Sequence, residues 1–177
     1  ELHPVGEYAW SRVGGERIFE HYSRENGIPL VQLRLNYAHE LRYGVLVDLA
    51  TKVFNEEIID VTMGHLNALW QGDANAMTLC ALNHVSIPPT ILNLAGPETL
   101  SVRRIAIEDG EMMRRPVRIQ GEEASDAFLS NGQKALDLFG YPRVGVRTMM
   151  RWIVDWIQEG GRLLNKPTHF ESRDGNY

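Results

Sequence analysis

The feature that most constrains the fold of this chain is a long helical segment that leads directly into a short apolar strand. Residues 7–26 are expected to form a helix that ends at Gly27, because glycine readily adopts the left-handed conformation that closes helices. The apolar run 28–35 is then expected to form a short buried strand. A helix that leads into such a strand is one half of a right-handed crossover in a parallel sheet. The pattern therefore predicts an α/β fold.

Helical and strand-like segments continue to alternate along the rest of the chain. The tail 166–177 is the exception, because it is polar and without periodicity, and we expect it to be loose. The expected helices are 45–55, 72–83, one capped by Thr99 or Ser101 that runs to Met113, a short one within 131–142, and a mostly buried one over 146–157; the expected strands are 58–63, 66–70, 89–96 and 116–120.

The composition indicates which general class of protein this chain belongs to. The 177 residues are 44% hydrophobic and 23% charged, which is ordinary for a globular protein of one domain, or one and a part. The net charge of -5 argues against a nucleic-acid surface, which requires a concentrated basic face. No apolar stretch approaches the ~20 residues of a membrane span.

Cysteine and histidine usage excludes two further kinds of site. The single cysteine, Cys80, allows no disulfide within the chain and predicts a reducing, cytoplasmic compartment. It lies in an apolar run, so we expect it to be a buried small hydrophobe. The histidines show no metal-ligand spacing, and no metal site is expected.

Tyr8 and Arg12 are the first candidate functional pair. Their spacing of one helical turn places both side chains on the same helix face. A cation held beside a phenol stabilises its ionised form, which makes Tyr8 a candidate general acid or base. The alternative is a surface cation packed on an aromatic ring. Gly14 and Gly15, inside the same helix, are expected to permit close packing against a cofactor or a docked strand.

The stretch Tyr8-Ala-Trp-Ser-Arg12, followed by Gly15-Glu16, resembles the Tyr-x-x-x-Lys helix of the extended short-chain dehydrogenase/reductases, the NAD-dependent epimerase/dehydratase family. The resemblance implies that Tyr8 donates or accepts the reacting proton. It also implies that Arg12, which stands where the family has Lys, supplies the charge and binds the nicotinamide ribose of NAD or NADP. A guanidinium has a different geometry from an ammonium and is effectively never deprotonated.

Two later segments carry the same resemblance. Leu33-Arg34 is similar to the Leu-Arg that ends a strand before the nicotinamide-side loop, with Asn36 one place earlier than the family's Asn. Residues 131–142 are similar to the family's late Asp-x-x-Lys-Ala-x-x-x-Leu-Gly-Tyr-x-Pro signature. The resemblance implies cofactor contacts from Tyr8, Arg12, Asn36 and Tyr37, and substrate contacts from Asn36, Arg42 and Asp73. Asp73 lies in the first turn of its helix, where its carboxylate complements the helix dipole. We therefore expect a structural role for Asp73 before a substrate contact.

The resemblance covers residues 4–160, but only the second half of a family member. The Gly-rich dinucleotide fingerprint is nowhere in this sequence. The implied fold is the C-terminal part of a Rossmann-like doubly wound parallel sheet (1–57), a small α/β substrate-binding lobe (58–165) and a loose tail (166–177).

Three functional hypotheses follow. The first is a fragment of an NAD(P)-dependent epimerase, dehydratase or reductase that acts by hydride transfer on a small molecule and is inactive without its N-terminal half. A sugar derivative is one candidate substrate, although His65-Leu66-Asn67 stands where nucleotide-sugar members carry an Arg. The second is a non-catalytic dinucleotide-binding sensor or interaction protein, and the third is a stand-alone binding module. A homodimer through helices 7–26 and 45–55 is compatible with their apolar residues, as is burial within the chain.

Overall fold

The helix and strand expected at the start of the chain are both present. The computed structural model describes residues 4–173. Helix α1 (Gly6–Asn26) ends at Gly27, whose φ of 64° is left-handed. Strand β1 (Val31–Leu35) follows and pairs in parallel with β6 (Thr90–Leu94), from Val31 opposite Thr90 to Leu35 opposite Leu94. The predicted α/β class is confirmed.

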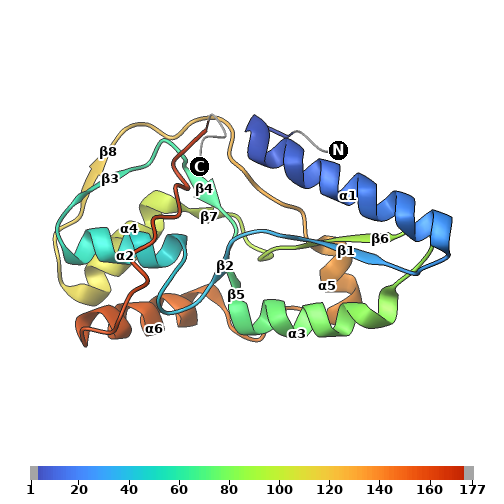
Figure 1. Ribbon diagram of the computed structural model, residues 1–177. Helices are drawn as coiled ribbons and strands as arrows, with labels where there is room; N and C mark the ends of the chain where they lie inside the picture. Colours follow the sequence, from blue (N-terminus) through green and yellow to red (C-terminus); the bar gives the residue numbers. More distant parts are fainter. Residues whose placement is uncertain (1–3, 174–177) are drawn as a thin grey trace.

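Helices cover both sides of the β1–β6 pair. Helix α1 lies along one side, and α3 (Gln71–Ala81) and α5 (Gln133–Phe139) lie on the other (Figure 1). A 3-10 turn, η1 (Leu82–His84), follows α3. A small second core lies between these elements and consists of Leu69, Ala74, Met77, Leu94, Ala135 and Leu136. We call this part of the chain the sheet unit.

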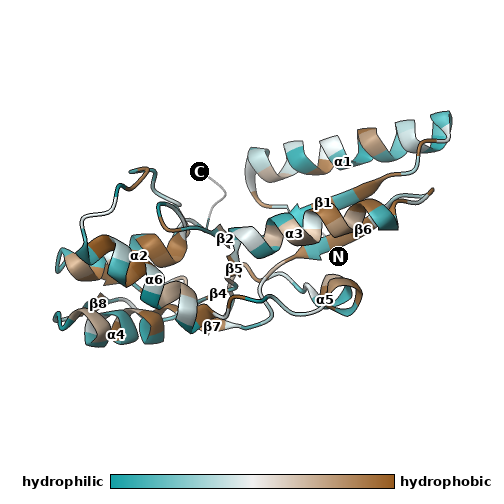
Figure 2. Ribbon diagram, turned by 90° about the horizontal axis from the view of Figure 1, so that it is seen from below, coloured by the Kyte–Doolittle hydropathy of each residue, from teal (hydrophilic) through white to brown (hydrophobic). Residues whose placement is uncertain are grey.

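The larger core belongs to a lobe at the other end of the molecule. Helices α2 (Val45–Phe54), α4 (Val102–Met113) and α6 (Val146–Gln158) pack against one another there, beside the parallel pair β3 (Ile58–Asp60) and β8 (Arg118–Gln120). Figure 2 shows apolar and polar residues alternating along these helices, and their buried apolar residues form the lobe core. Two more short pairs, β2 (Ala38–His39) with β5 (Leu69–Trp70) and β4 (His65–Leu66) with β7 (Leu100–Ser101), connect the lobe to the sheet unit.

The packing crosses the predicted boundary at residue 57 in both directions. Helix α2 lies before that boundary but packs on α4 and α6, and β6 lies after it but pairs with β1. The apolar side of α2, with Val45, Leu49 and Val53, is at most 1% exposed. This correction removes α2 from the predicted dimer surface, because its apolar residues are buried within the chain.

The tail is docked rather than loose as far as residue 173. Phe170 is 2% exposed and belongs to the lobe core. The backbone N–H and hydroxyl of Thr168 donate to Asp48 Oδ2 on α2, at 3.0 and 2.6 Å, and Glu171 pairs with Lys52 one turn further along α2. We call residues 164–173 the strap. The sequence-based expectation failed because one aromatic residue without periodic neighbours anchors the segment; residues 174–177 lie outside the described part.

One further side chain differs from expectation because of its position on a helix. Cys80 is exposed on α3, since the inner side of this helix is occupied by Ala74, Met77 and Ala81. Trp152 of α6 is 39% exposed and packs edge-on against Trp70, with ring centroids 5.4 Å apart. None of the helices between residues 4 and 173 has the length and apolarity that a membrane span requires.

Asp109 is an unusual member of the lobe. It lies on the inner side of α4, is 1% exposed, and neither carboxylate oxygen has a hydrogen-bond partner. Burial, with a smaller contribution from the charge of Glu108, raises the pKa of the Asp109 carboxyl to about 8. This carboxyl is therefore mostly protonated in the folded protein at neutral pH.

We predict that Phe170→Ala lowers the free energy of unfolding by about 3 kcal/mol, because it removes a buried ring and leaves a cavity. The same change at Phe19, which is 64% exposed, should cost less than about 0.5 kcal/mol. Urea denaturation of both variants and the parent measures the difference. Equal effects of the two changes would show that the strap does not stabilise the lobe.

We predict that Asp109 makes stability fall between about pH 4 and pH 8. In the unfolded chain this carboxyl ionises near the ordinary aspartate pKa of 3.8, whereas the folded one keeps its proton up to about pH 8. The stabilisation is thus complete below the unfolded pKa, and is lost as pH rises through the folded pKa. Asp109→Asn should unfold at higher urea concentration than the parent at pH 8, with a smaller gain at pH 5. A gain that is equal at both pH values would contradict the assignment.

Candidate functional site

Tyr8 and Arg12 lie on the same face of α1, near the end of the helix that adjoins the C-terminal end of β1 (Figure 1). The Arg12 guanidinium carbon is 5.7 Å from the centroid of the Tyr8 ring, which is a cation–π contact. The Tyr8 side chain is 60% exposed. The pair is therefore accessible to a ligand, and its guanidinium lies over the ring.

Glu16 and Arg34 connect this helix to the sheet. Arg34 Nε and Nη2 donate to the two carboxylate oxygens of Glu16 at 2.8 and 2.6 Å, and both side chains are mostly buried. The hydrogen bonds to Glu16 raise the pKa of Arg34 further above its usual value. Gln32 Nε2 also donates to the Glu16 carbonyl at 2.8 Å. The motif residues Glu16 and Arg34 thus form one bidentate pair, which fixes α1, and with it Tyr8, on β1.

A hollow of about 350 Å³ lies beside this pair, between α1 and β1. A Cβ atom added to Gly14 or Gly15 would meet nothing within 4 Å, so the expected close packing at these glycines does not occur within the described chain. Among residues 4–173, β1 has only β6 as a ladder partner. The residues that line the hollow are Arg12, Gly15, Glu16, Phe19, Leu30, Val31, Gln32 and Leu33.

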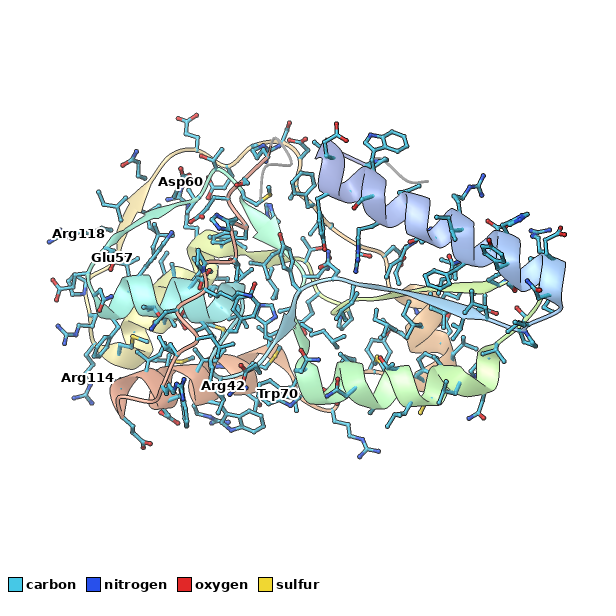
Figure 3. All side chains as sticks on the ribbon, in the orientation of Figure 1. Arg42, Glu57, Asp60, Trp70, Arg114 and Arg118 are labelled. Atoms are coloured by element: carbon cyan, nitrogen blue, oxygen red, sulfur yellow. The ribbon has the colours of Figure 1, made fainter. Side chains whose placement is uncertain are left out.

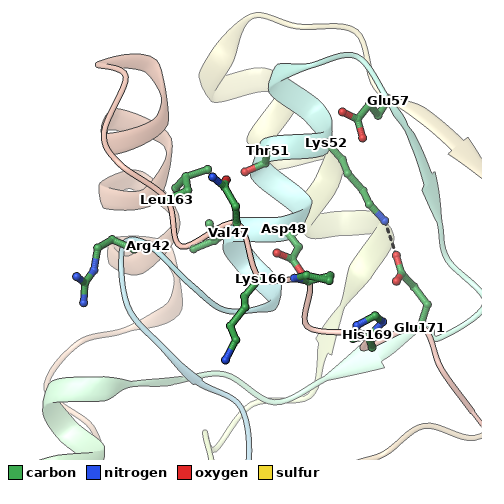
Figure 4. Close-up of a pocket in the computed structure, with 12 residues that line it drawn as sticks. Arg42, Val47, Asp48, Thr51, Lys52, Glu57, Leu163, Lys166, His169 and Glu171 are labelled. Carbon is green, nitrogen blue, oxygen red and sulfur yellow. Dashed lines mark hydrogen bonds and ion pairs between the residues drawn. The ribbon is translucent and has the colours of Figure 1, made fainter. Parts of the chain in front are cut away.

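The loop 36–44 carries three of the predicted contacts at the C-terminal end of β1. The Asn36 backbone N–H donates to Leu94 O at 2.9 Å, and its side-chain Oδ1 is buried without a hydrogen-bond partner. Tyr37 has a φ of 40°. Arg42 lies apart, paired with Glu40 at 3.0 Å. It lines a different hollow, of about 250 Å³, between α2 and the strap (Figure 4).

The hollow beside Arg42 shares no lining residue with the hollow beside Arg12. Figure 3 shows Arg42 near the start of α2, and its carbonyl accepts a hydrogen bond from Leu164 N at 3.1 Å. The structure therefore does not place Arg42 in one hollow with Arg12, and a substrate contact from Arg42 stays a prediction.

Asp73 has a structural contact. It is 8% exposed in the first turn of α3, and its Oδ2 accepts a hydrogen bond from Val144 N at 3.0 Å. The carboxylate thus connects α3 to the segment that leads into α6. A substrate contact from this residue also stays a prediction.

Two buried polar residues were not singled out from the sequence. Asn67 donates to Glu98 O at 3.0 Å and accepts from Ser130 N at 2.9 Å, at the edge of a polar hollow of about 360 Å³. His39 is 1% exposed, and its Nδ1 lies 2.7 Å from Tyr37 O. Burial lowers the pKa of His39 to about 4, outweighing the opposing effect of that hydrogen bond. The only signal in the sequence was a polar residue within or beside an apolar run.

No group of three or more His, Cys, Asp or Glu side chains within residues 4–173 is arranged to hold a metal ion. The side chains of the described site include a phenol, a guanidinium and an amide at the end of a parallel strand pair. In open α/β sheets, this end of the strands is where ligands bind.

Comparison with known proteins identifies the fold. Neither protein-family models nor curated protein sequences match the chain. Among solved structures, UDP-glucose 4-epimerase of Thermus thermophilus in complex with NAD is 20% identical, with a TM-score of 0.71 over 88% of this chain and 55% of that one.

Two more solved structures give the same result. UDP-glucuronic acid 4-epimerase from Bacillus cereus, in complex with UDP-glucuronic acid and NAD, is 17% identical with a TM-score of 0.75 over 90% of this chain and 55% of that one. dTDP-glucose 4,6-dehydratase from Bacillus anthracis str. Ames, in complex with NAD, is 13% identical with a TM-score of 0.72 over 90% and 54%. The chain spans about half the length of these structures and has the fold of their C-terminal part.

We predict that Glu16→Gln lowers the free energy of unfolding by about 1–2 kcal/mol, because it breaks a mostly buried bidentate pair and leaves Arg34 without its counter-charge. Glu20→Gln is the matched control on the same helix. Glu20 pairs with Arg17 and Arg24 at the surface, where solvent screening leaves such pairs with little effect on stability. Thermal and urea unfolding compare the two variants, and an effect of Glu20→Gln as large as that of Glu16→Gln would refute the assignment.

Proposed function

We propose that this chain is the C-terminal part of an NAD(P)-dependent epimerase, dehydratase or reductase, with Tyr8 as its general acid/base and Arg12 in the place of the usual Lys. The observation that carries the proposal is the placement of the Tyr8 helix. The Glu16–Arg34 pair holds α1 on β1, in a chain with the fold of the C-terminal part of NAD-bound epimerases. Tyr8 is thereby accessible near the strand ends where such folds bind ligands.

The residues present fit a dinucleotide cofactor. When bound, NAD or NADP would accept a hydride from the substrate and return it. Its nicotinamide end is proposed to be bound by Arg12, Asn36 and Tyr37. Arg12 offers several N–H donors for ribose hydroxyls. The buried Asn36 Oδ1 lacks a partner and needs a hydrogen-bond donor. Tyr8 would move the proton of the substrate hydroxyl, with its phenolate stabilised by the Arg12 charge.

A sugar derivative is the proposed substrate class. The solved structures of similar fold include complexes with UDP-glucose and UDP-glucuronic acid. A sugar offers hydroxyl donors to a buried acceptor such as Asn36 Oδ1, and a carbinol carbon to hydride chemistry. Asn36, Arg42 and Asp73 remain the proposed substrate contacts.

A further segment is proposed to complete the sheet beside β1. Parallel sheets are normally covered on both faces and have more than two strands. The hollow beside β1 offers room for a docked strand, with Gly14 and Gly15 leaving the α1 side open. We propose that the N-terminal half of the complete protein occupies this position, and that α1 and β1, within the predicted unit 1–57, form part of the dinucleotide-binding fold. We also propose that the protein is cytoplasmic, as its single cysteine suggests.

Helix α1 alone remains a proposed dimer surface. Its exposed apolar residues include Ile18, Phe19 and Tyr22, at 58%, 64% and 60%, and of these Phe19 also lines the hollow beside β1. A second copy of the same helix would cover these residues. Exposed apolar residues on one helix face favour such an association.

The alternative function is a non-catalytic dinucleotide-binding protein that acts as a sensor or interaction module. The observation that favours it is the position of the Arg12 guanidinium over the Tyr8 ring. A cation in a stacked position stabilises the helix surface without requiring proton transfer.

Calorimetry with NAD and NADP on the complete protein, followed by turnover assays with a panel of UDP- and dTDP-sugars, tests the proposal. Tyr8→Phe should lower turnover by about 100-fold or more while retaining cofactor binding, because it removes only the proton-transferring hydroxyl. Tyr22→Phe on the same helix is the control and should leave turnover unchanged.

The two functions give different results. Cofactor binding without turnover in the parent, and a large gain of turnover in Arg12→Lys, would identify a decayed enzyme. Cofactor binding with no turnover in either protein would favour the sensor. No binding of NAD or NADP to the complete protein would refute both.

A further inference from the structure

The loop 36–44 is held in an unusual conformation. Tyr37 has a φ of 40° and Gly44 a φ of 129°, so the backbone departs from the extended region at both ends of the loop. Between them, Glu40 N donates to Tyr43 O at 3.1 Å and closes a tight turn. Left-handed conformations of residues other than glycine are costly and persist where surrounding contacts enforce them.

Two donors hold the carbonyl of Tyr37: Leu69 N, at 3.1 Å, and the ring of His39. The His39 ring is 1% exposed, and Nδ1 lies 2.7 Å from Tyr37 O. A carbonyl can only accept, so Nδ1 carries the proton and donates to it. This bond fixes the carbonyl of the residue that has the left-handed φ. The neutral tautomer suits the buried position, because an imidazolium there would lose its hydration.

The same ring also limits the other end of the loop. A Cβ atom on Gly44 would lie 2.6 Å from His39 Cδ2 and 3.1 Å from Cγ. Gly44 precedes α2 without a side-chain cap, and its carbonyl accepts from Val47 N and Asp48 N. The His39 ring therefore packs against the start of α2 in space that only a glycine leaves free.

We propose that His39 is a positioning residue, which holds the loop 36–44 in the shape that presents Asn36 and Tyr37 to the ligand at the C-terminal end of β1. The ligand part rests on the function proposed above. His39 lies three residues after Asn36, whose Oδ1 is buried and unpartnered, and whose N–H is bonded to Leu94 O. Without the His39 bond, only Leu69 N, at 3.1 Å, still holds the Tyr37 carbonyl. The backbone between β1 and β2 then gains freedom, and Asn36 loses its fixed direction.

Amide hydrogen exchange of the complete protein tests the positioning role without a ligand. His39→Leu keeps a buried side chain of similar size but removes the donor to Tyr37 O. The amides of Asn36 and Glu40 should then exchange about tenfold faster, the effect of one lost hydrogen bond, while the lobe amide of Val61, bonded to Gln120 O, should not change. His39→Asn retains a side-chain N–H donor and should restore most of the protection.

The matched control is His21→Leu, which makes the same change at an exposed position on α1 and should leave all three amides unchanged. Unchanged exchange at Asn36 and Glu40 in His39→Leu would overturn the proposal. Equal acceleration at Val61, with no recovery in His39→Asn, would also overturn it, because His39 would then be an ordinary core residue. If His39→Leu does not fold, His39→Met, which also lacks the donor, takes its place and is judged by the same outcomes.

Calorimetry with UDP-glucose and NAD separates this proposal from the proposed function. We expect His39→Leu to bind UDP-glucose at least about fivefold more weakly than His39→Asn and the parent. Parent-like affinity in His39→Leu would overturn the ligand part of the proposal. If even the parent binds neither compound, the proposed function fails, while the exchange data still determine whether His39 holds the loop.

Discussion

The parallel ladder between β1 and β6 is the constraint on which the rest of the structure depends. It joins two segments that are 59 positions apart in the chain, with Val31 opposite Thr90, and gives α1 one face to cover and α3 and α5 the other. Each strand then leads into a connection toward the lobe, through the loop 36–44 or through the β6–β7 turn. The Glu16–Arg34 pair orients α1 relative to this ladder, because it fixes one turn of α1 on one residue of β1. The position of Tyr8 follows from these two interactions.

The lobe depends on a different principle. Three helices with apolar stripes pack together, and the larger of the two hydrophobic cores within residues 4–173 lies among them. Such a core tolerates a protonated carboxyl at Asp109 because the surrounding helices supply ample apolar burial. The sheet unit has a much smaller core, so it depends more on ladder bonds and on the bidentate ion pair. Substitutions in the lobe are therefore expected to alter the stability of the protein. Substitutions in the sheet unit are expected to alter the geometry of the candidate site.

Much of the fold was predictable from local patterns. Gly27 ended α1 as expected, Ser101 caps α4 through a bond from Arg104 N, and the stripe of Met149, Ile153 and Ile157 is buried. Patterns that depend on distant partners were less informative. Phe170 stands alone in a polar tail, so periodicity could not indicate its burial, and the side of α3 that carries Cys80 was not set by its local sequence. For the site, the sequence brought Tyr8 and Arg12 onto one face, but the stacked geometry and the role of His39 arise from tertiary packing.

The docking of the strap has a consequence for the order in which the protein assembles. Thr168 bonds a residue of α2 that lies 120 positions earlier in the chain, and Phe170 fills a core whose other members are made before it. On the ribosome, α2, α4 and α6 are therefore synthesised while the place of this ring is still open. The lobe can collapse early, but it reaches its final packing only after residue 170 has left the exit tunnel. Until then the nascent lobe exposes apolar surface, and chaperones can bind that surface in the interval before residue 170 emerges.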